Sequence, residues 1–454
     1  MESISVKQVA AALGLSSDND AAVTNICTDS REAGEGSLFF AIKGERVDGH
    51  DYVDDVLKNG AVCAIVEHPG NYPKEKTLVV ENSVKAMLQL AKWYRTTLSP
   101  KVVAITGSVG KTTTKDMIAA VTSAEYSTIK TLGNQNNEIG APRTLMSIDS
   151  STQVAIVEMG MSGFGEIHDL ADAAKPDIGV ITNIGVSHLE SLGSRENILK
   201  AKCELLDCLP KGAPVFLCAD NDLLCTVERE DVNIIFYGIE SEKAVLRGEI
   251  LEMDTDSMNV KISYRDNSFE AKIPGTGKHL LLNALAAFGV GTELGMSGKE
   301  IVSALENYTP SGMRQKMVDI CGITVVEDCY NASPDSVLAA MNTLAIYPAK
   351  GRKYAVLADM LELGSATEEG HKQCGAAAAK AAQELVVYGE NAKFYLQGAQ
   401  GIKNCHINAF SQKYEIAEYL SKVLEKGDIV WFKASRGMRL EDAIEQLYEL
   451  LQKR

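Results

Sequence analysis

Residues 104–117 have the sequence AITGSVGKTTTKDM, which passes from a short apolar run through a glycine-containing loop into a helix-forming stretch. Glycine permits the tight turn and the close backbone approach that a bound anion requires. Amide N–H groups at the start of the following helix direct partial positive charge at phosphate oxygens. The order of strand, loop, Lys-Thr and helix therefore predicts a phosphate-binding loop made of Gly107, Ser108, Val109, Gly110, Lys111, Thr112 and Thr113.

The expected ligand of this loop is ATP with Mg²⁺. Lys111 would reach the outer phosphates, and Thr112 would offer its hydroxyl to the cation. The loop departs from the pattern GxxxxGKT because Ile105 stands where the first glycine would be. GTP stays open as an alternative, although an NKxD sequence that would recognise guanine is not apparent. The structural alternative is a glycine turn that binds nothing.

Short apolar runs alternate with helical stretches around this loop, which is typical of a parallel sheet covered on both faces. The expected central strands are 102–106, 154–160, 178–185, 215–220 and 234–239, followed by strand-like alternation over 244–274. A second series of expected strands lies at 323–329, 354–359, 385–389 and 429–435, with a helix at 368–383. The N-terminal part combines expected helices at 6–13 and 84–98 with short strands at 37–41 and 62–66.

A chain of 454 residues exceeds the size at which one hydrophobic core stops growing, so about three domains are expected. We predict an α/β protein with a small mixed α/β domain at 1–83. A central domain at 84–311 would contain the phosphate loop in a doubly wound, mostly parallel sheet. A Rossmann-like α/β domain would occupy 312–454, and Pro310–Gly312 is a candidate hinge before it.

The composition argues against several classes of protein. Binding to nucleic acid needs clustered Lys and Arg, whereas this chain has a net charge of -16. The sequence contains no apolar stretch of about 18 residues that could span a bilayer and no basic, apolar signal sequence. The ten cysteines include no CxxC pair, which favours reduced thiols. We therefore expect a cytoplasmic monomer that acts on small molecules, without a nucleic acid or membrane partner.

Two further polar residues are expected near the phosphate loop. In doubly wound sheets, ligands gather beyond the carboxyl ends of the strands. Glu158 ends the expected strand VAIVE, and His188 follows the strand that ends near Ile184. A carboxylate and an imidazole at this edge can hold a divalent cation that offsets charge during phosphoryl transfer. Taken alone, Glu158 is more simply a surface acid, and His188 is more simply a structural histidine.

The stretch NIGVSHLESLGSRENILKAKCEL at 183–205 resembles the Mur ligase family over its whole length. In that family the lysine of the AK pair, here Lys202, is carbamoylated by CO₂, which replaces an ammonium with an anionic carbamate. The resemblance therefore implies a metal site formed by Thr112, Glu158, His188 and the carbamate of Lys202. By spacing alone, Lys202 is an ordinary solvated helix lysine.

Other motifs carry the same resemblance and imply an ATP site. GTGKHLLLNALAA at 275–287 resembles the adenine-contacting helix, with Asn283 as the family's asparagine. The usual His-Asn pair of this helix is His279-Leu280 here, so a role of that first asparagine is missing. SGMRQKM at 311–317 supplies Arg314 for a phosphate, and VVEDCYNASPDSV at 325–337 supplies Asp328 for the ribose.

The substrate contacts implied by the resemblance lie in four segments, whose simpler interpretation is polar turns and loops. TDSR at 28–31 and SLFFAIKGERVDGHDY at 37–52 resemble the part of the family that binds a UDP-sugar, and TLGNQNNEIGAP at 131–142 resembles a segment near the peptidyl substrate. FKASRGMRLE at 432–441 has Ala434 where the family usually has glycine. The implied contacts are Asp29, Ser30, Arg31, Lys43, Gly44, Asp48, His50, Asn134, Asn136, Asn137, Asn331, Ser333, Ser435 and Arg436.

Within the family, YNASP at 330–334 together with TDSR resembles the members that add a dipeptide. The resemblance implies that ATP phosphorylates the terminal carboxylate of UDP-N-acetylmuramoyl-tripeptide and that the amine of D-alanyl-D-alanine attacks the acyl phosphate. Its catalytic residues would be Lys111, Glu158, His188 and Lys202. The alternatives are another Mur-type ligase, a ligase similar to folylpolyglutamate synthetase, and a nucleotide-dependent switch or assembly factor. The sequence leaves open whether the tripeptide ends in lysine or diaminopimelate.

Overall fold

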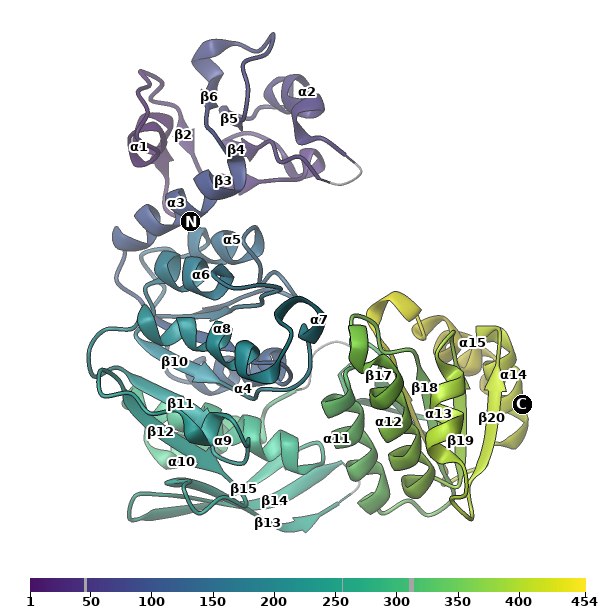
Figure 1. Ribbon diagram of the computed structural model, residues 1–454. Helices are drawn as coiled ribbons and strands as arrows, with labels where there is room; N and C mark the ends of the chain where they lie inside the picture. The colour runs from purple at the N-terminus through teal and green to yellow at the C-terminus, as the bar shows by residue number, and fades with distance from the viewer. Residues whose placement is uncertain (45–46, 255, 310–313) are drawn as a thin grey trace. The chain divides into compact units, whose positions relative to one another are not determined.

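The computed structural model describes residues 1–44, 47–254, 256–309 and 314–454. Strands and helices alternate along most of this chain, so the predicted α/β class is confirmed (Figure 1). Two compact units form, one from 1–106, 125–180 and 203–215 and the other from 107–124, 181–202 and 216–454. The predicted domain boundary at 311/312 and the candidate hinge Pro310–Gly312 lie outside the described residues. The boundaries of the three predicted domains stay a prediction.

Two small sheets form near the N-terminus. One is an antiparallel pair of β1 and β2, and the other is parallel with the strand order β3-β4-β5-β6. Helix α1 starts where the Ser5 side chain accepts a hydrogen bond from the Gln8 amide and the Gln8 side chain accepts one from Ser5, a capping box. The elements are β1 (Ile4–Ser5), α1 (Val6–Ala12), β2 (Ala22–Val23), β3 (Asn25–Cys27), β4 (Ser37–Phe40), α2 (Val53–Lys58), β5 (Cys63–Val66), β6 (Thr77–Val79) and α3 (Ser83–Thr96).

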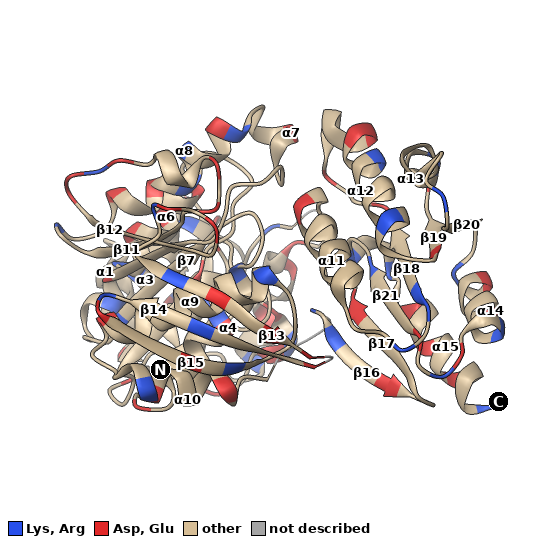
Figure 2. Ribbon diagram, turned by 90° about the horizontal axis from the view of Figure 1, so that it is seen from below, with Lys and Arg blue, Asp and Glu red and all other residues tan. Residues whose placement is uncertain are grey.

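The largest sheet has nine strands in the order β15-β14-β13-β12-β11-β10-β7-β9-β8. Strand β7 pairs in parallel with β9, and Ile105 lies in register with Glu158. Strands β13 to β15 form antiparallel hairpins. Glu270 and Lys272 place exposed charges on β15, an edge position where charge discourages pairing with another chain (Figure 2). The strands are β7 (Lys101–Thr106), β8 (Thr128–Lys130), β9 (Val154–Glu158), β10 (Ile178–Ile181), β11 (Pro214–Cys218), β12 (Asn233–Gly238), β13 (Leu246–Met253), β14 (Ser257–Tyr264) and β15 (Asn267–Pro274).

Helices connect these strands. Helix α4 packs closely on α9. A Cβ added to Gly291 would lie only 2.9 Å from a methyl group of Val121, so glycine permits this close approach. Helix α10 begins after a capping box made by Ser297 and Glu300. None of the helices in the described ranges combines the length and apolar character needed to cross a bilayer. The helices are α4 (Lys111–Thr122), α5 (Gly140–Met146), α6 (Glu166–Ala174), α7 (Leu189–Leu192), α8 (Arg195–Asp207), α9 (Lys278–Glu293) and α10 (Gly298–Glu306).

The C-terminal part forms a six-stranded sheet in the order β16-β17-β21-β18-β19-β20. Strand β16 is antiparallel to β17, and the other neighbours are parallel. The elements are β16 (Lys316–Ile320), β17 (Ile323–Asp328), α11 (Pro334–Ile346), β18 (Lys353–Ala358), α12 (Thr367–Ala381), β19 (Glu384–Tyr388), α13 (Ala392–Ala399), β20 (His406–Phe410), α14 (Lys413–Val423), β21 (Ile429–Lys433) and α15 (Glu441–Gln452).

Both faces of this sheet are buried, which explains why its central strands are apolar throughout. Val326 and Trp431 belong to one core, which packs against α11, α12 and α13. Val325 and Val430 belong to the core of the opposite face, which packs against α14 and α15. Because neighbouring residues of a strand point to opposite faces, each strand contributes to both cores.

The sequence predicted most of the strands, with boundaries that differ by a few residues. Among the described residues seven strands were not predicted, namely β1, β2, β3, β6, β8, β16 and β20. Each is a short edge strand or lies next to an edge, where partial exposure removes the continuous apolar pattern. The predicted central strands 154–160, 178–185 and 215–220 end earlier in the structure, because their last residues leave the sheet as loops at its carboxyl edge.

Helices α12 and α13 approach each other at two glycines. A Cβ at Gly375 would lie 2.2 Å from the carbonyl oxygen of Tyr395, and one at Gly398 would lie 1.9 Å from that of Lys372. We expect Gly375→Ala to lower the free energy of unfolding, measured with urea, by roughly 1–3 kcal/mol, because backbone atoms cannot rotate away from the added methyl.

The matched control is Gly34→Ala, which adds the same methyl group where no other atom lies within 4 Å. Its free energy of unfolding should stay within about 0.5 kcal/mol of the unmodified protein. If Gly375→Ala were as stable as this control, the close approach of the two helices would be wrong.

Candidate nucleotide and substrate site

The predicted phosphate loop leaves the end of β7 and enters α4 at Lys111. Gly110 precedes the helix with φ 84°, a left-handed conformation that favours glycine. Gly107 is required for a different reason, because a Cβ there would lie 1.9 Å from the Thr182 hydroxyl oxygen. The two glycines therefore fit a backbone that turns sharply against a neighbouring segment.

Residues that follow β10 hold this loop in place. Thr182 donates its hydroxyl to the Val109 carbonyl at 2.6 Å, and the Asn183 side-chain oxygen accepts from the Val109 amide at 2.8 Å. The Asn183 carbonyl accepts from the Ser108 amide at 3.0 Å. Neither Thr182 nor Asn183 was predicted as a site residue. Asn183 begins the family-like stretch at 183–205, which was the available signal.

Lys111 lies at the end of the loop with its ammonium turned back to the loop backbone. Its Nζ donates to the Gly107 carbonyl at 2.6 Å. Thr112 is buried, and Gly110 at the N-cap position has no side chain to satisfy the first amides of α4. The N–H groups at the start of a helix attract anions, so the loop and the helix together suit a phosphate.

Asn283 lies in α9 and contacts the same helix start. Its side-chain oxygen accepts from the Thr114 hydroxyl at 3.1 Å. A Cβ at Gly110 would lie 3.0 Å from that oxygen. Asn283 is 8% exposed, so its side chain is fixed beside the phosphate loop. The structure thus brings this predicted adenine contact next to the predicted phosphate contacts.

Glu158 is the last residue of β9 and is buried. Its carboxylate accepts a hydrogen bond from the Asn136 amide at 2.8 Å, and its own backbone amide donates to the Thr131 hydroxyl at 3.0 Å. In the sheet Glu158 lies beside Ile105, two residues before Gly107. Two predicted site residues, Glu158 and Asn136, are therefore in direct contact.

The other two asparagines of this segment differ from Asn136. Asn137 uses its side-chain oxygen to accept from the Gly140 amide at 3.0 Å, at the start of α5. Asn134 is exposed. The structure thus gives Asn137 a local structural contact and leaves Asn134 on the surface.

Lys202 lies in α8 and is 1% exposed. Among the described residues, no hydrogen bond or ion pair holds its amine. Burial lowers the pKa of the Lys202 ammonium well below its usual value, and repulsion from the Lys111 ammonium lowers it further. By spacing alone Lys202 would be a solvated helix lysine, whereas the structure buries its side chain. A lowered pKa shifts the amine toward its neutral, nucleophilic form.

His188 precedes α7 and adopts a left-handed backbone with φ 65°, which is uncommon for a residue other than glycine. Such conformations need support from their surroundings and occur frequently at functional sites. His188 is half-buried.

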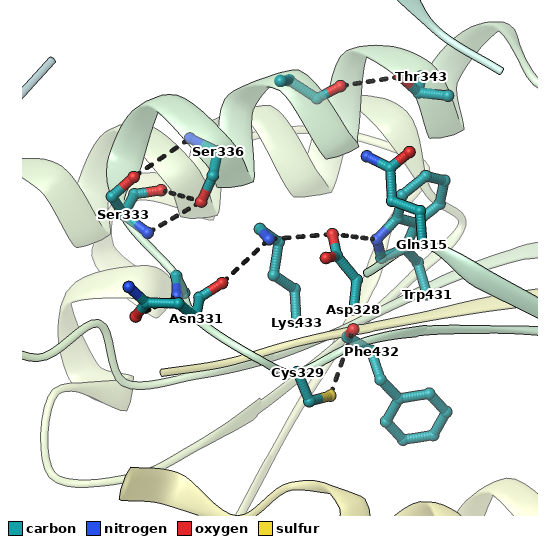
Figure 3. Close-up of polar contacts among 12 residues, drawn as sticks. Gln315, Asp328, Cys329, Asn331, Ser333, Ser336, Thr343, Trp431, Phe432 and Lys433 are labelled. Carbon is teal, nitrogen blue, oxygen red and sulfur yellow. Dashed lines mark hydrogen bonds and ion pairs between the residues drawn. The ribbon is translucent and has the colours of Figure 1, made fainter. Parts of the chain in front are cut away.

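The carboxyl ends of β17 and β21 contain a buried polar cluster (Figure 3). Asp328 accepts hydrogen bonds from the Lys433 ammonium at 2.9 Å and from the Trp431 indole at 3.3 Å. Lys433 also donates to the Asn331 carbonyl at 3.3 Å. The predicted ribose contact and a predicted dipeptide contact thus share one lysine, which was not predicted as a site residue.

The other predicted contacts of this part each have a partner within the protein. Arg314 places its guanidinium 4.1 Å from the centre of the Tyr330 ring, a cation–π contact. Ser435 donates its hydroxyl to the Ala332 carbonyl at 3.3 Å. Ser333 caps α11 and is buried, whereas Arg436 is exposed and pairs with Glu441 at 2.8 Å. Ser333 and Arg436 therefore have structural partners of their own.

The predicted UDP-sugar contacts form two local pairs in the N-terminal part. Arg31 and Asp29 form a bidentate ion pair, and hydrogen bonds from Arg31 lower the pKa of Asp29 to about 2. His50 donates from Nδ1 to Asp48 at 2.6 Å while its Nε2 accepts from the Glu67 amide at 2.9 Å.

His50 therefore uses both ring nitrogens in internal hydrogen bonds, which is the arrangement of a structural histidine. Lys43 and Gly44 are exposed, and Ser30 begins a short 3-10 turn. Of the predicted contacts in this part, Arg31 and Lys43 have the exposed positive charge that a pyrophosphate requires.

Comparisons with known proteins agree over most of the chain. The family described as Mur ligase family, catalytic domain, matches residues 22–95. The Mur ligase middle domain matches 105–291, and the Mur ligase, glutamate ligase domain, matches 313–436. The UDP-N-acetylmuramoyl-tripeptide–D-alanyl-D-alanine ligase of Bacillus subtilis is 35% identical over 94% of this chain and 93% of its own. The ligase of that name from Synechocystis is 34% identical over 94% and 92%.

Solved structures give the same result. MurF from Acinetobacter baumannii has a TM-score of 0.90 to this chain, with 29% identity and 99% coverage of both chains. MurF from Thermotoga maritima, in complex with ADP, has a TM-score of 0.87 and 30% identity over 95% of this chain and 98% of its own. From sequence identity over nearly its full length and from its fold, the chain belongs to the Mur ligase family.

Proposed function

We propose that this ATP-dependent ligase joins D-alanyl-D-alanine to UDP-N-acetylmuramoyl-tripeptide and releases ADP and phosphate, a step of peptidoglycan precursor synthesis. The observation that carries the proposal is the loop from Gly107 to Lys111, whose backbone is fixed by Thr182 and Asn183 and opens onto the start of α4. The choice of substrates follows the names of the Bacillus subtilis and Synechocystis relatives, which both name this reaction.

ATP would bind along the phosphate loop, α9 and the end of β17. Lys111 would exchange its hydrogen bond to the Gly107 carbonyl for oxygens of the outer phosphates. Asn283 is fixed beside Gly110, where it would contact the adenine side of the nucleotide. Asp328 would accept hydrogen bonds from the ribose, and Arg314 would contact a phosphate.

The reaction would proceed in two steps. The terminal carboxylate of the tripeptide attacks the γ-phosphorus of ATP, so that ADP leaves and an acyl phosphate forms. The free amine of D-alanyl-D-alanine then attacks the acyl carbon, loses a proton, and displaces phosphate. This route needs no nucleophile from the protein, so the chain's contribution is to position the reactants and to offset negative charge with Lys111.

We infer that Lys202 is carbamoylated by CO₂. A lysine must be neutral to attack CO₂, and burial beside the Lys111 ammonium lowers the pKa of Lys202 in the direction that makes it neutral. An uncharged amine buried without a partner is also costly, because a polar group loses its water. The carbamate is an anionic acceptor, which can bind a cation or a hydrogen-bond donor of the protein.

Mg²⁺ would be held by the Thr112 hydroxyl, Glu158, His188 and the carbamate of Lys202. Among the described residues no group of three His, Cys, Asp or Glu side chains forms a metal site. Protein-bound Mg²⁺ commonly uses few carboxylates together with phosphates, so oxygens of ATP would complete its coordination. The ion would supply positive charge at the transferring phosphoryl group.

The predicted substrate contacts other than those of ATP remain part of the proposal. Asp29, Ser30, Arg31, Lys43, Gly44, Asp48 and His50 would surround the UDP-sugar, Asn134, Asn136 and Asn137 the peptide, and Asn331, Ser333, Ser435 and Arg436 the dipeptide. We further propose that the protein acts as a monomer in the cytoplasm.

The direct test is a phosphate-release assay with purified protein. Phosphate should appear only when ATP, UDP-N-acetylmuramoyl-tripeptide and D-alanyl-D-alanine are all present, because the amine consumes the acyl phosphate. Replacing Lys111 with Ala should lower kcat by about a thousandfold or more, since a charge that acts on the transferring phosphate is lost. Product mass should equal the tripeptide plus the dipeptide less water.

The result also separates the alternatives. Release with a single amino acid, but without D-alanyl-D-alanine, would indicate another Mur-type or folylpolyglutamate synthetase-like ligase. A rate of ATP hydrolysis that does not change when either substrate is added would indicate a nucleotide-dependent switch or assembly factor. Comparing tripeptides that end in lysine and in diaminopimelate would determine which of them the protein uses.

The carbamate is tested by Lys202→Ala. We expect kcat to fall by about a hundredfold or more, because the anionic ligand is lost, and short carboxylates such as formate or acetate should restore part of it. Lys200→Ala is the matched control, since Lys200 is exposed on the same helix two residues earlier. It should retain the activity of the unmodified protein. Full activity of Lys202→Ala, or complete lack of rescue in a folded variant, would argue against the carbamate.

A further inference from the structure

Lys433 has no role in the reaction proposed above, although it lies among residues that do. It is the last residue of β21 and lies in register with Asp328, the last residue of β17. Equivalent positions of neighbouring parallel strands point to the same face, so the two side chains emerge together at the carboxyl edge of the sheet. Figure 3 shows them facing each other beneath α11.

The pair is removed from water. Lys433 is 4% exposed and Asp328 is 6% exposed. Burial of one such charge without the other costs several kcal/mol, so each requires its partner. The Lys433 ammonium and the Asp328 carboxylate are therefore held in one geometry.

That geometry uses only one oxygen of the carboxylate. Lys433 at 2.9 Å and Trp431 at 3.3 Å both donate to Oδ2 of Asp328. In the described part of the chain, no donor contacts Oδ1. The ammonium and the indole thus fix the plane of the carboxylate and leave its second oxygen as an acceptor for a ligand.

The same ammonium also fixes the loop that follows β17. Lys433 donates to the Asn331 carbonyl at 3.3 Å, and Ser435, two residues later, donates to the Ala332 carbonyl at 3.3 Å. The end of β21 therefore holds two successive carbonyls of the loop. Beyond them, Ser333 caps α11, so the loop is fixed at both of its ends.

We propose that Lys433 is a positioning residue that orients Asp328 toward the ribose of ATP and the 329–333 loop toward the dipeptide. The proposal rests on the proposed function, which assigns Asp328 and Asn331 to those two substrates. One buried charge would then set the geometry of two binding regions. Lys433 itself contacts neither substrate.

The test compares ATP with its 2′-deoxy and 3′-deoxy analogues in the phosphate-release assay. In the unmodified protein, removal of the hydroxyl that Asp328 accepts should raise the KM for nucleotide by roughly tenfold or more. Lys433→Met keeps the length of the side chain but removes its charge. We expect this variant to have a higher KM for ATP. The deoxy-to-ATP ratio, which is the KM for the deoxy analogue divided by the KM for ATP, should fall to about two or less.

A second readout comes from the dipeptide. Because the loop loses a hydrogen bond to the Asn331 carbonyl, Lys433→Met should also raise the KM for D-alanyl-D-alanine, while kcat at saturating substrates changes less. A residue that merely stabilised the fold would lower the yield of active protein without changing the ratio between two nucleotides.

Arg352→Met is the matched control. Arg352 pairs at 2.9 Å with Glu384, whose side chain is 4% exposed, at the amino end of the same sheet. The variant likewise leaves a buried carboxylate without its cation, but away from Asp328. It should lose stability in thermal unfolding while both KM values and the deoxy-to-ATP ratio stay as in the unmodified protein.

If Lys433→Met does not fold, Trp431→Phe decides, because it removes the other donor to Oδ2. It should also lower the ratio of the KM for the deoxy analogue to the KM for ATP, but by a smaller factor than Lys433→Met. The proposal is wrong if the folded variants keep the ratio of the unmodified protein. If the unmodified protein releases no phosphate with its three substrates, the proposed function has failed instead.

Discussion

The phosphate loop is held by Thr182 and Asn183, and the rest of the nucleotide site depends on that constraint. A glycine turn is flexible by itself, and its ordering would cost binding energy. Three hydrogen bonds from the segment after β10 fix the backbone of Ser108 and Val109 before any ligand arrives. The Thr182 hydroxyl also takes the space that a side chain at position 107 would need. The neighbour, as much as the turn, therefore makes Gly107 obligatory.

Local patterns predicted what depends on neighbouring residues of the chain. The buried strand before Gly107, the helix after Lys111 and the apolar strands of the C-terminal sheet all follow from short-range periodicity. The role of Lys433 could not be predicted in this way, because it depends on the register of β21 with β17, and Lys433 and Asp328 are 105 residues apart. Asn183 was missed for the same reason. For Asn137, Ser333 and His50, family resemblance implied ligand contacts where the structure also provides internal partners.

Two buried lysines show how surroundings decide chemistry. Lys433 and Lys202 are both almost inaccessible to water. Lys433 lies against a carboxylate, so its charge is offset and the side chain serves as a fixed cation. Lys202 lacks such a partner in the described residues and lies near the Lys111 ammonium, so the pKa of its amine falls. The same side chain therefore has an anionic partner in one place and a lowered pKa in the other.

The contact between Asn283 and the start of α4 has a consequence for how the nucleotide is recognised. The oxygen of Asn283 that accepts from Thr114 would also lie 3.0 Å from a Cβ at Gly110, so α9 approaches the turn before α4 closely. A shift of one would press on the other. In the proposed site α9 would contact the base and the turn would contact the phosphates. A ligand with only one of these halves, such as adenosine or inorganic tripolyphosphate, would therefore make only part of the contacts.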